Sequence, residues 1–301
     1  MKPLYIWAGG KNKMIKKYQE NLTIPVSDYN TYVEPFFGGG AMMIHIYQNN
    51  PSVQRFVMND VNKELIGIYN AIKYDCDSFI TRLNILSDKY LPLEKEQRKE
   101  FYYDLRKEYT TNWTIWNKID ESATLYFLMK TGFNGIWQTN LSSNGRFATP
   151  SGLLNQKTHV YELDNVIKWK DLLQRVDIMS GDWKTCVTSI NDKAFYFLDP
   201  PYRSSFTTYE QEFDDSHQVE CIDFAKQANE NGDYVMLCNR DSGDDFFTSQ
   251  QGDLSLNYYD VTYTAGRRKK QTDGTHTACN ATEILLFSNN ISVSNNQKDD
   301  T

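Results

Sequence analysis

Apolar and polar residues alternate along the chain in a pattern that predicts strands and helices in turn. Short apolar runs that end in glycine, proline or acidic residues predict buried strands, roughly at 32–34, 54–58, 176–179, 194–198 and 234–238. Runs with helical spacing follow several of them, at 41–47, 162–174 and 217–231. Two alternating stretches, 258–264 and 282–288, predict a terminal hairpin. The pattern indicates an α/β fold.

A helical insertion interrupts this alternation. From Val61 to about Lys130 the apolar positions recur with the period of amphipathic helices. We therefore predict one α/β domain made of residues 1–74 and 161–288, with a helical domain at 75–160 inserted into it. Residues 289–301 are polar and have no periodicity, so we expect a disordered tail.

Within the insertion, residues 131–152 are rich in Gly, Asn, Ser and Thr. Loops of this length without secondary structure of their own tend to be functional. The side chains of Gln138, Asn140, Asn144 and Arg146 have the chemistry to read base edges. A hairpin with a purely structural role is the alternative.

Composition narrows the possible function classes. The 301 residues, 40% of them hydrophobic, can bury a sizeable core. The net charge of -7 argues mildly against a nucleic-acid partner, although lysines gather in residues 1–17 and Arg267 to Lys270 form a second basic cluster. Cysteines and histidines lack metal-ligand spacing, so we predict no metal. Without a membrane-length apolar run or a signal-peptide core, we expect a soluble, intracellular protein with no membrane partner.

Asp199, Pro200, Pro201 and Tyr202 carry the strongest candidate chemistry. They follow the apolar run 195–198, so they are expected at the carboxyl edge of the sheet, where open α/β sheets bind ligands. A carboxylate and an adjacent carbonyl can accept both hydrogens of an exocyclic amine, and a tyrosine ring can stack on the flat ring that carries it. The segment predicts a planar amine substrate such as adenine. An ordinary proline turn after a strand is the alternative.

Glycine turns and acidic strand ends predict a second, nucleoside-sized ligand. Two glycines precede Lys11 in the segment Trp7–Lys11, and three more occupy 38–40 between a strand and a helix. Asp60 ends the next strand, where an acid usually holds a ribose hydroxyl pair. Asp182 ends a later strand and could accept an exocyclic amine. Each acid could instead be a helix N-cap.

In their order along the chain, these motifs resemble the Dam-type family of DNA adenine-N6 methyltransferases. The resemblance covers Trp7 to about Phe287 and rests on Trp7–Lys11, the FxGxG of 36–40, Gly132–Gly135, Asp199–Tyr202 and Glu283–Leu285. It implies a Rossmann-like S-adenosylmethionine-dependent methyltransferase sheet, mostly parallel with one reversed strand, and a small inserted helical target-recognition domain. It also implies double-stranded DNA as substrate, as in restriction-modification systems. We expect a monomer or a weak dimer.

The resemblance implies roles for individual residues. The catalytic positions are Asp199, Pro200 and Tyr202. The positions matching those around the cofactor S-adenosylmethionine are Trp7, Lys11, Phe36, Gly38, Gly40, Asp60, Asp182 and Asp199. The DNA-binding candidates are Gln138, Thr139, Asn140, Asn144, Arg146, Arg267 and Arg268. We expect the adenine to be flipped out of the duplex and methylated directly on N6, leaving S-adenosylhomocysteine and no covalent enzyme intermediate.

The sequence departs from the family where the target would be read. Members that read GATC usually carry a basic residue and an aromatic where this chain has Gln138 and Thr139, and FNVP where it has residues 147–150. A different target sequence is therefore expected. An enzyme acting on cytosine N4 or a glutamine amide is disfavoured by Asp at position 199. RNA adenine as substrate and a catalytically silent DNA-binding module remain as alternatives.

Overall fold

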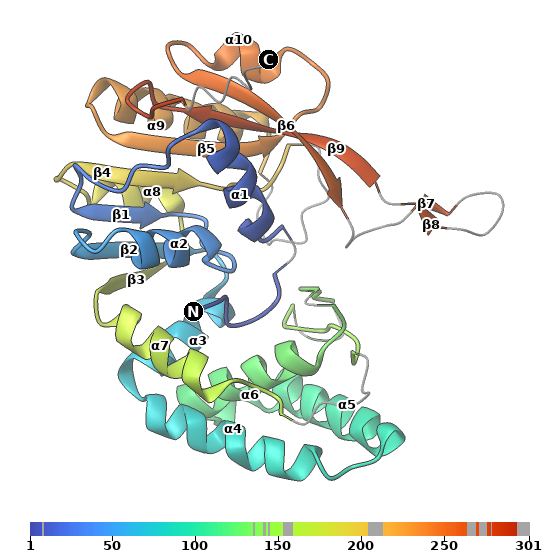
Figure 1. Cartoon of the computed structure of the whole chain (residues 1–301). Coiled ribbons are helices and arrows are strands. Elements are labelled where there is room, and N and C mark those ends of the chain that lie inside the picture. The colour runs from blue at the N-terminus through green and yellow to red at the C-terminus, as the bar shows by residue number, and fades with distance from the viewer. Residues whose placement is uncertain are drawn as a thin grey trace, which may run out of the picture. The chain divides into compact units, whose positions relative to one another are not determined.

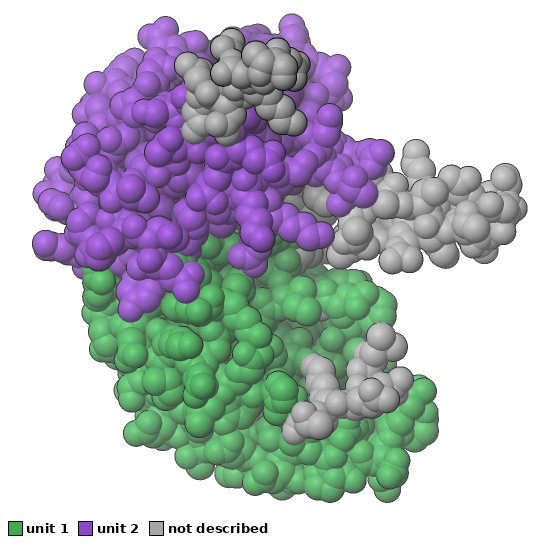
Figure 2. Space-filling view, viewed as in Figure 1, with its two compact units in different colours: residues 1–10, 38–44, 59–182 green, residues 11–37, 45–58, 183–301 purple. Residues whose placement is uncertain are grey.

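The structure is a computed structural model of the chain. It describes residues 1–7, 9–134, 136–140, 143, 145–152, 159–203, 213–263, 269–270, 276–277 and 279–293. The chain divides into two compact units (Figure 2): the first contains residues 1–10, 38–44 and 59–182, and the second contains 11–37, 45–58 and 183–301. These units do not follow the sequence-based boundaries near 75 and 160, which stay a prediction.

A seven-stranded sheet has the strand order β3-β2-β1-β4-β5-β9-β6 (Figure 1). Its strands are β1 (Thr31–Glu34), β2 (Arg55–Asp60), β3 (Val176–Ser180), β4 (Ala194–Leu198), β5 (Tyr234–Arg240), β6 (Ser255–Tyr263) and β9 (Cys279–Phe287). β1 runs parallel to β2 and β4, and β4 runs parallel to β5. β9 is antiparallel to both its neighbours, β5 and β6. The predicted mostly parallel sheet with one reversed strand is confirmed.

The second unit contains the central strands of the sheet. Every residue of β1 and β4 is buried, and so are the inner residues of β5. Strands covered on both faces need continuous apolar runs, which explains why these three were readable from the sequence. The helices of this unit are α1 (Asn12–Asn21), α8 (Trp183–Thr188), α9 (Asp215–Glu230) and α10 (Phe246–Gln250), and a short two-stranded sheet pairs β7 (Lys269–Lys270) with β8 (His276–Thr277).

The first unit is mainly helical. Its helices are α3 (Lys63–Tyr74), α4 (Cys76–Tyr90), α5 (Lys95–Thr111), the 3-10 turn η1 (Trp113–Ile115), α6 (Lys118–Thr131) and α7 (Leu163–Leu173). α6 packs against α3, α4 and α5 and is buried along most of its length. A helix surrounded in this way needs no polar face, and its sequence is correspondingly apolar after the first turn. The remaining helix, α2 (Ala41–Asn49), has residues in both units.

Candidate active site

Lys11 and the segment after β4 form a compact polar cluster in the second unit. The Lys11 Nζ atom lies 2.8 Å from Asp199 Oδ1 and donates a 2.6 Å hydrogen bond to the Tyr202 hydroxyl. The same ammonium is 4.8 Å from the centre of the Tyr202 ring. The Lys11 side chain is only 5% exposed, whereas that of Asp199 is 21% exposed. Lys11 was expected at the cofactor; the structure places it with the predicted catalytic residues.

Burial and charge act in opposite directions on this ion pair. Burial raises the pKa of Asp199, and the attraction of Lys11 only partly offsets this effect. Burial alone would lower the pKa of Lys11, but the negative charges near it, Asp199 foremost, raise its pKa above the usual value. Lys11 therefore stays charged, and it is the group that favours an ionised Asp199 at this buried position.

Glu283 is a further acid near this cluster. It lies on β9 opposite Arg240 of β5 and is 3% exposed. Its negative charge contributes to the raised pKa of both Lys11 and Asp199. The motif Glu283–Leu285 singled out this position in the sequence, but the sequence did not show which residues lie near Glu283. Glu283 and Arg240 become neighbours only when β9 pairs with β5.

Phe36 lies in the same unit, directly after β1. Because β1 and β4 are parallel neighbours, Phe36 and Asp199 follow the carboxyl ends of adjacent strands. The Phe36 ring is 5.8 Å from the Trp183 ring and 5.7 Å from the Phe213 ring, centre to centre. Such a group of aromatic faces suits a flat heterocycle.

In the first unit, Trp7 packs on the predicted glycine turn. Gly38 and Gly40 have positive φ angles of 50° and 65°. A Cβ atom at Gly38 would lie 2.7 Å from the Trp7 Nε1 atom, so the turn needs glycine both for its backbone conformation and for the indole beside it. The Gly38 N–H donates to Asp60 Oδ2 at 2.9 Å, and the Gly38 carbonyl accepts from the Tyr5 hydroxyl at 2.9 Å.

Asp60 connects this turn to two strand ends. Its Oδ1 atom accepts from the Asn62 N–H at 2.9 Å, and its backbone carbonyl accepts from Ser180 Oγ and Gly181 N at the end of β3. Asp182, at the end of β3, is exposed. Burial raises the pKa of Asp60, against the lowering effect of its two backbone hydrogen bonds.

The alternative role of Asp60 as a helix cap is wrong. The cap of α3 is Asn62, whose Oδ1 atom accepts from the N–H groups of Glu64 and Leu65. The Asp60 carboxylate uses two acceptor positions on the backbone and keeps others for a ligand. A buried acid at a strand end, beside a glycine turn, offers acceptor oxygens of the kind that can hold ribose hydroxyls.

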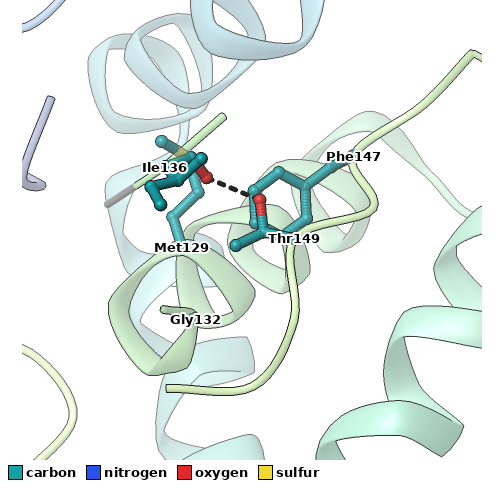
Figure 3. Close-up of a pocket in the computed structure, with 5 residues that line it drawn as sticks. All are labelled: Met129, Gly132, Ile136, Phe147 and Thr149. Carbon is teal, nitrogen blue, oxygen red and sulfur yellow. Dashed lines mark hydrogen bonds between the residues drawn. The ribbon is translucent and has the colours of Figure 1, made fainter. Parts of the chain in front are cut away.

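The predicted DNA-reading loop is a short hairpin. Thr139 and Phe147 form an antiparallel bridge, and the Ala148 N–H donates to the Gln138 carbonyl at 2.6 Å. Figure 3 shows the base of the hairpin, where Phe147 and Thr149 line a crevice with Ile136, Met129 and Gly132. Thr149 Oγ1 donates to the Ile136 carbonyl at 2.5 Å. The base is thus fixed by buried contacts.

The candidate readers on this hairpin differ in their surroundings. Gln138 and Asn140 are exposed, and Thr139 is half-buried. Asn140 Oδ1 accepts from the Ser143 N–H at 2.7 Å, so this oxygen shapes the turn. Asn144, Arg267 and Arg268 lie outside the described residues.

Arg146 takes part in a buried charge network. Its Nη2 atom lies 2.8 Å from Glu64 Oε1 on α3 and 2.5 Å from Glu121 Oε1 on α6. Its guanidinium is 4.4 Å from the centre of the Tyr109 ring on α5, and the Tyr109 hydroxyl donates to Glu64 Oε1 at 2.6 Å. The Arg146 side chain is 12% exposed. These contacts tie the hairpin to three helices of the first unit.

Among the residues that the structure describes, no group of three or more His, Cys, Asp or Glu side chains is placed to hold a metal ion. None of the helices described is both long enough and apolar enough to cross a membrane.

The comparisons with known proteins agree with this geometry. A family model described as D12 class N6 adenine-specific DNA methyltransferase matches residues 7–265. The chain belongs to this D12 class. It is 32% identical over 260 residues to the type II methyltransferase M.MjaIII of Methanocaldococcus jannaschii, covering 84% of this chain and 89% of the relative.

Two further relatives of this D12-class chain carry names of the same kind. The type II methyltransferase M1.LlaDCHI of Lactococcus lactis subsp. cremoris is 31% identical over 250 residues, covering 80% of this chain and 82% of the relative. A DNA adenine methylase of Vibrio cholerae is 26% identical over 247 residues, covering 78% and 80%. The predicted family is confirmed, and the protein is a DNA adenine methyltransferase.

Proposed function

We propose that this D12-class enzyme transfers the methyl group of S-adenosylmethionine to N6 of an adenine flipped out of double-stranded DNA. The observation that carries the proposal is the cluster of Lys11, Asp199 and Tyr202 directly after β4. It combines a half-buried carboxylate, a backbone without N–H donors at Pro200 and Pro201, and a tyrosine ring held at its hydroxyl. An exocyclic amine on a flat ring matches all three features.

The proposed role of Asp199 is to accept one N6 hydrogen while the Pro200 carbonyl accepts the other. Because Lys11 contacts Oδ1, the carboxylate atom assigned to the amine is Oδ2. Two acceptors draw the nitrogen lone pair out of ring conjugation and point it away from the base plane. Asp199 also stabilises the positive charge that develops on N6 and can receive the proton that N6 releases.

The proposed role of Lys11 is to prepare this carboxylate. A buried aspartate without a cation would favour its protonated form, which is a weaker acceptor for the amine and cannot take up the proton that N6 releases. The Lys11 ammonium offsets that tendency and also holds the Tyr202 hydroxyl. The ring of Tyr202 is thereby oriented for stacking on the extruded base.

The residues proposed to hold the cofactor are those of the glycine turn and the neighbouring strand ends. Asp60 would accept from the ribose hydroxyls, Asp182 from the adenine amine, and the backbone at Gly38 and Gly40 would approach the ligand closely. When bound, S-adenosylmethionine would supply the methyl group, activated for transfer by its sulfonium sulfur. The Trp7 ring, which packs on the glycine turn, is proposed to shield this ligand from water.

The residues of the hairpin are proposed to have two different roles: some contact DNA bases, and Arg146 holds the hairpin in place. Gln138 and Thr139 lie at exposed or half-exposed positions and are proposed to contact base edges, together with the Asn140 side-chain amide. Arg146 is instead proposed to hold the hairpin in place through Glu64 and Glu121. The exposed Lys13 and Lys16 on α1 are candidates for phosphate contacts that position the duplex without specifying sequence.

A transfer assay tests the proposed function. The protein is incubated with methyl-labelled S-adenosylmethionine and matched DNA and RNA oligonucleotides of random sequence, and the labelled nucleosides are identified by chromatography. Label on N6-methyladenine from duplex DNA is expected. Label only from RNA, label on cytosine, or binding to DNA without transfer would contradict the proposal and favour one of the alternatives.

A further inference from the structure

Two buried side-chain amides hold the backbone on both sides of Tyr202. Gln218 Nε2, on α9, donates to the Pro201 carbonyl at 2.7 Å. Asn239 Oδ1, on β5, accepts from the Arg203 N–H at 3.0 Å. The two amides are joined to each other, because Asn239 Nδ2 donates to Gln218 Oε1 at 2.9 Å. All of these residues lie in the second unit.

Gln218 and Asn239 together form what we call the amide relay. The groups bound at its two ends determine how the oxygen and NH2 group of each amide are oriented. The Pro201 carbonyl can only accept, so it requires the NH2 group of Gln218. The Arg203 N–H can only donate, so it requires the oxygen of Asn239. The remaining donor of Asn239 and acceptor of Gln218 then face each other. No other assignment of the two amide groups satisfies all three hydrogen bonds.

Burial makes the relay sensitive to substitution. Gln218 is 1% exposed and Asn239 is 0% exposed. A buried polar group that loses its partner has no water to replace it. The two amides can therefore hold the backbone only while Gln218 offers a donor to the Pro201 carbonyl and Asn239 an acceptor to the Arg203 N–H. Replacing the Gln218 donor by an acceptor would turn the attraction to the Pro201 carbonyl into repulsion.

The Arg203 side chain makes a second attachment close to the same place. Its Nε and Nη2 atoms pair with the two carboxylate oxygens of Asp215, in the first turn of α9, at 2.7 and 2.9 Å. Its Nη1 atom pairs with Asp244. The backbone of Arg203 is thus held by Asn239 of β5 and its side chain by Asp215 of α9 and by Asp244, while Lys11 holds the Tyr202 hydroxyl.

We infer that Gln218 and Asn239 are positioning residues for methyl transfer, which set the backbone of the Pro201–Arg203 segment so that Tyr202 and the Pro200 carbonyl meet the flipped adenine. The inference rests on the proposed function of Asp199, Pro200 and Tyr202. Neither amide touches the base. A shift of the segment by about 1 Å is enough to reduce turnover by about 100-fold, so the relay is expected to act on kcat.

The test compares the Gln218→Glu and Gln218→Leu variants with the wild type under single-turnover conditions. The carboxylate of Gln218→Glu faces the Pro201 carbonyl and repels it, whereas the protonated acid can donate to it as the native amide does. We expect a roughly 10- to 100-fold lower rate near pH 8, recovering towards the wild-type rate as the pH falls to about 6, because burial keeps the introduced acid protonated to unusually high pH. Gln218→Leu should lose the same rate without recovery.

Expressing each rate as a ratio to wild type at the same pH removes the titration of groups shared by both enzymes, including Asp199, Lys11, Asp214 and His217. Gln227→Glu makes the same chemical change at an exposed position of α9 and should keep the wild-type rate. Rates are normalised to the fraction of enzyme that binds cofactor, so misfolded protein does not contribute. A wild-type rate in Gln218→Leu, or a Gln218→Glu rate that does not rise above that of Gln218→Leu as the pH falls, would overturn the inference. Failure of the proposed function would instead appear as an inactive wild type.

Discussion

The Lys11 ammonium lies 2.8 Å from the Asp199 carboxylate, although the two residues are far apart in the sequence. Lys11 is the N-cap residue of α1 and Asp199 directly follows β4; the Lys11 side chain is buried and that of Asp199 is half-buried. The contact joins the lysine of the first glycine motif to the motif that carries the predicted chemistry. The contact supports the proposed role of Lys11 beside Asp199.

Replacing Lys11 by Met should shift the acid limb of the pH profile. The raised pKa of Asp199 means that kcat/KM falls, as the pH is lowered, at a pH above the ordinary aspartate value of about 3.9. Without the ammonium, the pKa of Asp199 rises further, so the limb should move to higher pH and the neutral-pH rate should fall. Pre-steady-state methyl transfer across the pH range measures this. Lys168→Met, at an exposed position of α7, is the control, and an unshifted limb in Lys11→Met would contradict the proposed role.

Replacing Arg146 by Met should destabilise the first unit without changing the target sequence. The substitution removes the cation that Glu64 and Glu121 share, while Glu121 keeps its ion pair with Lys118, and breaking such a buried pair typically costs about 3 kcal/mol. Urea unfolding followed by circular dichroism gives the free energy, and sequencing of methylated adenines gives the target. A changed target with unchanged stability would return Arg146 to the set of base readers.

Replacing Gln138 by Ala should change the target sequence without destabilising the protein. The side chain is exposed on the hairpin, so its loss should leave the melting temperature within a degree or two while it relaxes or alters which adenines are methylated. Gln48→Ala, at an exposed position of α2, is the matched control and should change neither property. An altered melting temperature with an unaltered methylation pattern would favour a purely structural hairpin.

Replacing Gly38 by Ala should weaken cofactor binding. The new methyl group would lie 2.7 Å from the Trp7 indole, and the positive φ angle adds about 1 kcal/mol of strain. Calorimetric titration with S-adenosylmethionine should show at least about tenfold weaker binding, partly restored when Trp7 is also shortened to Ala. Gly145→Ala has a positive φ angle but open space around it, and should bind the cofactor normally. Equal affinity in Gly38→Ala would exclude the turn from the cofactor site.

Features that depend on local sequence, such as buried strands, could be predicted from the sequence, whereas contacts between distant segments could not. Buried parallel strands leave continuous apolar runs, so β4 and the motif at Asp199 could be located without knowing the rest of the fold. The ion pairs of Arg146 were not readable, because its partners Glu64 and Glu121 come from two helices distant in the sequence; its contact with DNA stays a prediction.

The same limit applies to the residues that support the catalytic segment. Gln218 and Asn239 are ordinary polar residues in a helix and a strand, and only their burial and mutual geometry distinguish them. The sequence signal for this role was the position of Asn239, a polar residue next to the last residue of the largely apolar strand β5. Its partners could not be named until α9 was placed against β5.

The most direct test of the account measures methyl transfer to duplex DNA by Asp199→Ala. Asp199 is assigned to the methyl-accepting amine, so the variant should bind S-adenosylmethionine with little change but transfer no measurable methyl groups to adenine. Cofactor binding by calorimetry and label incorporation into DNA are measured on the same preparation. Wild-type turnover in the folded variant would contradict the account at its centre.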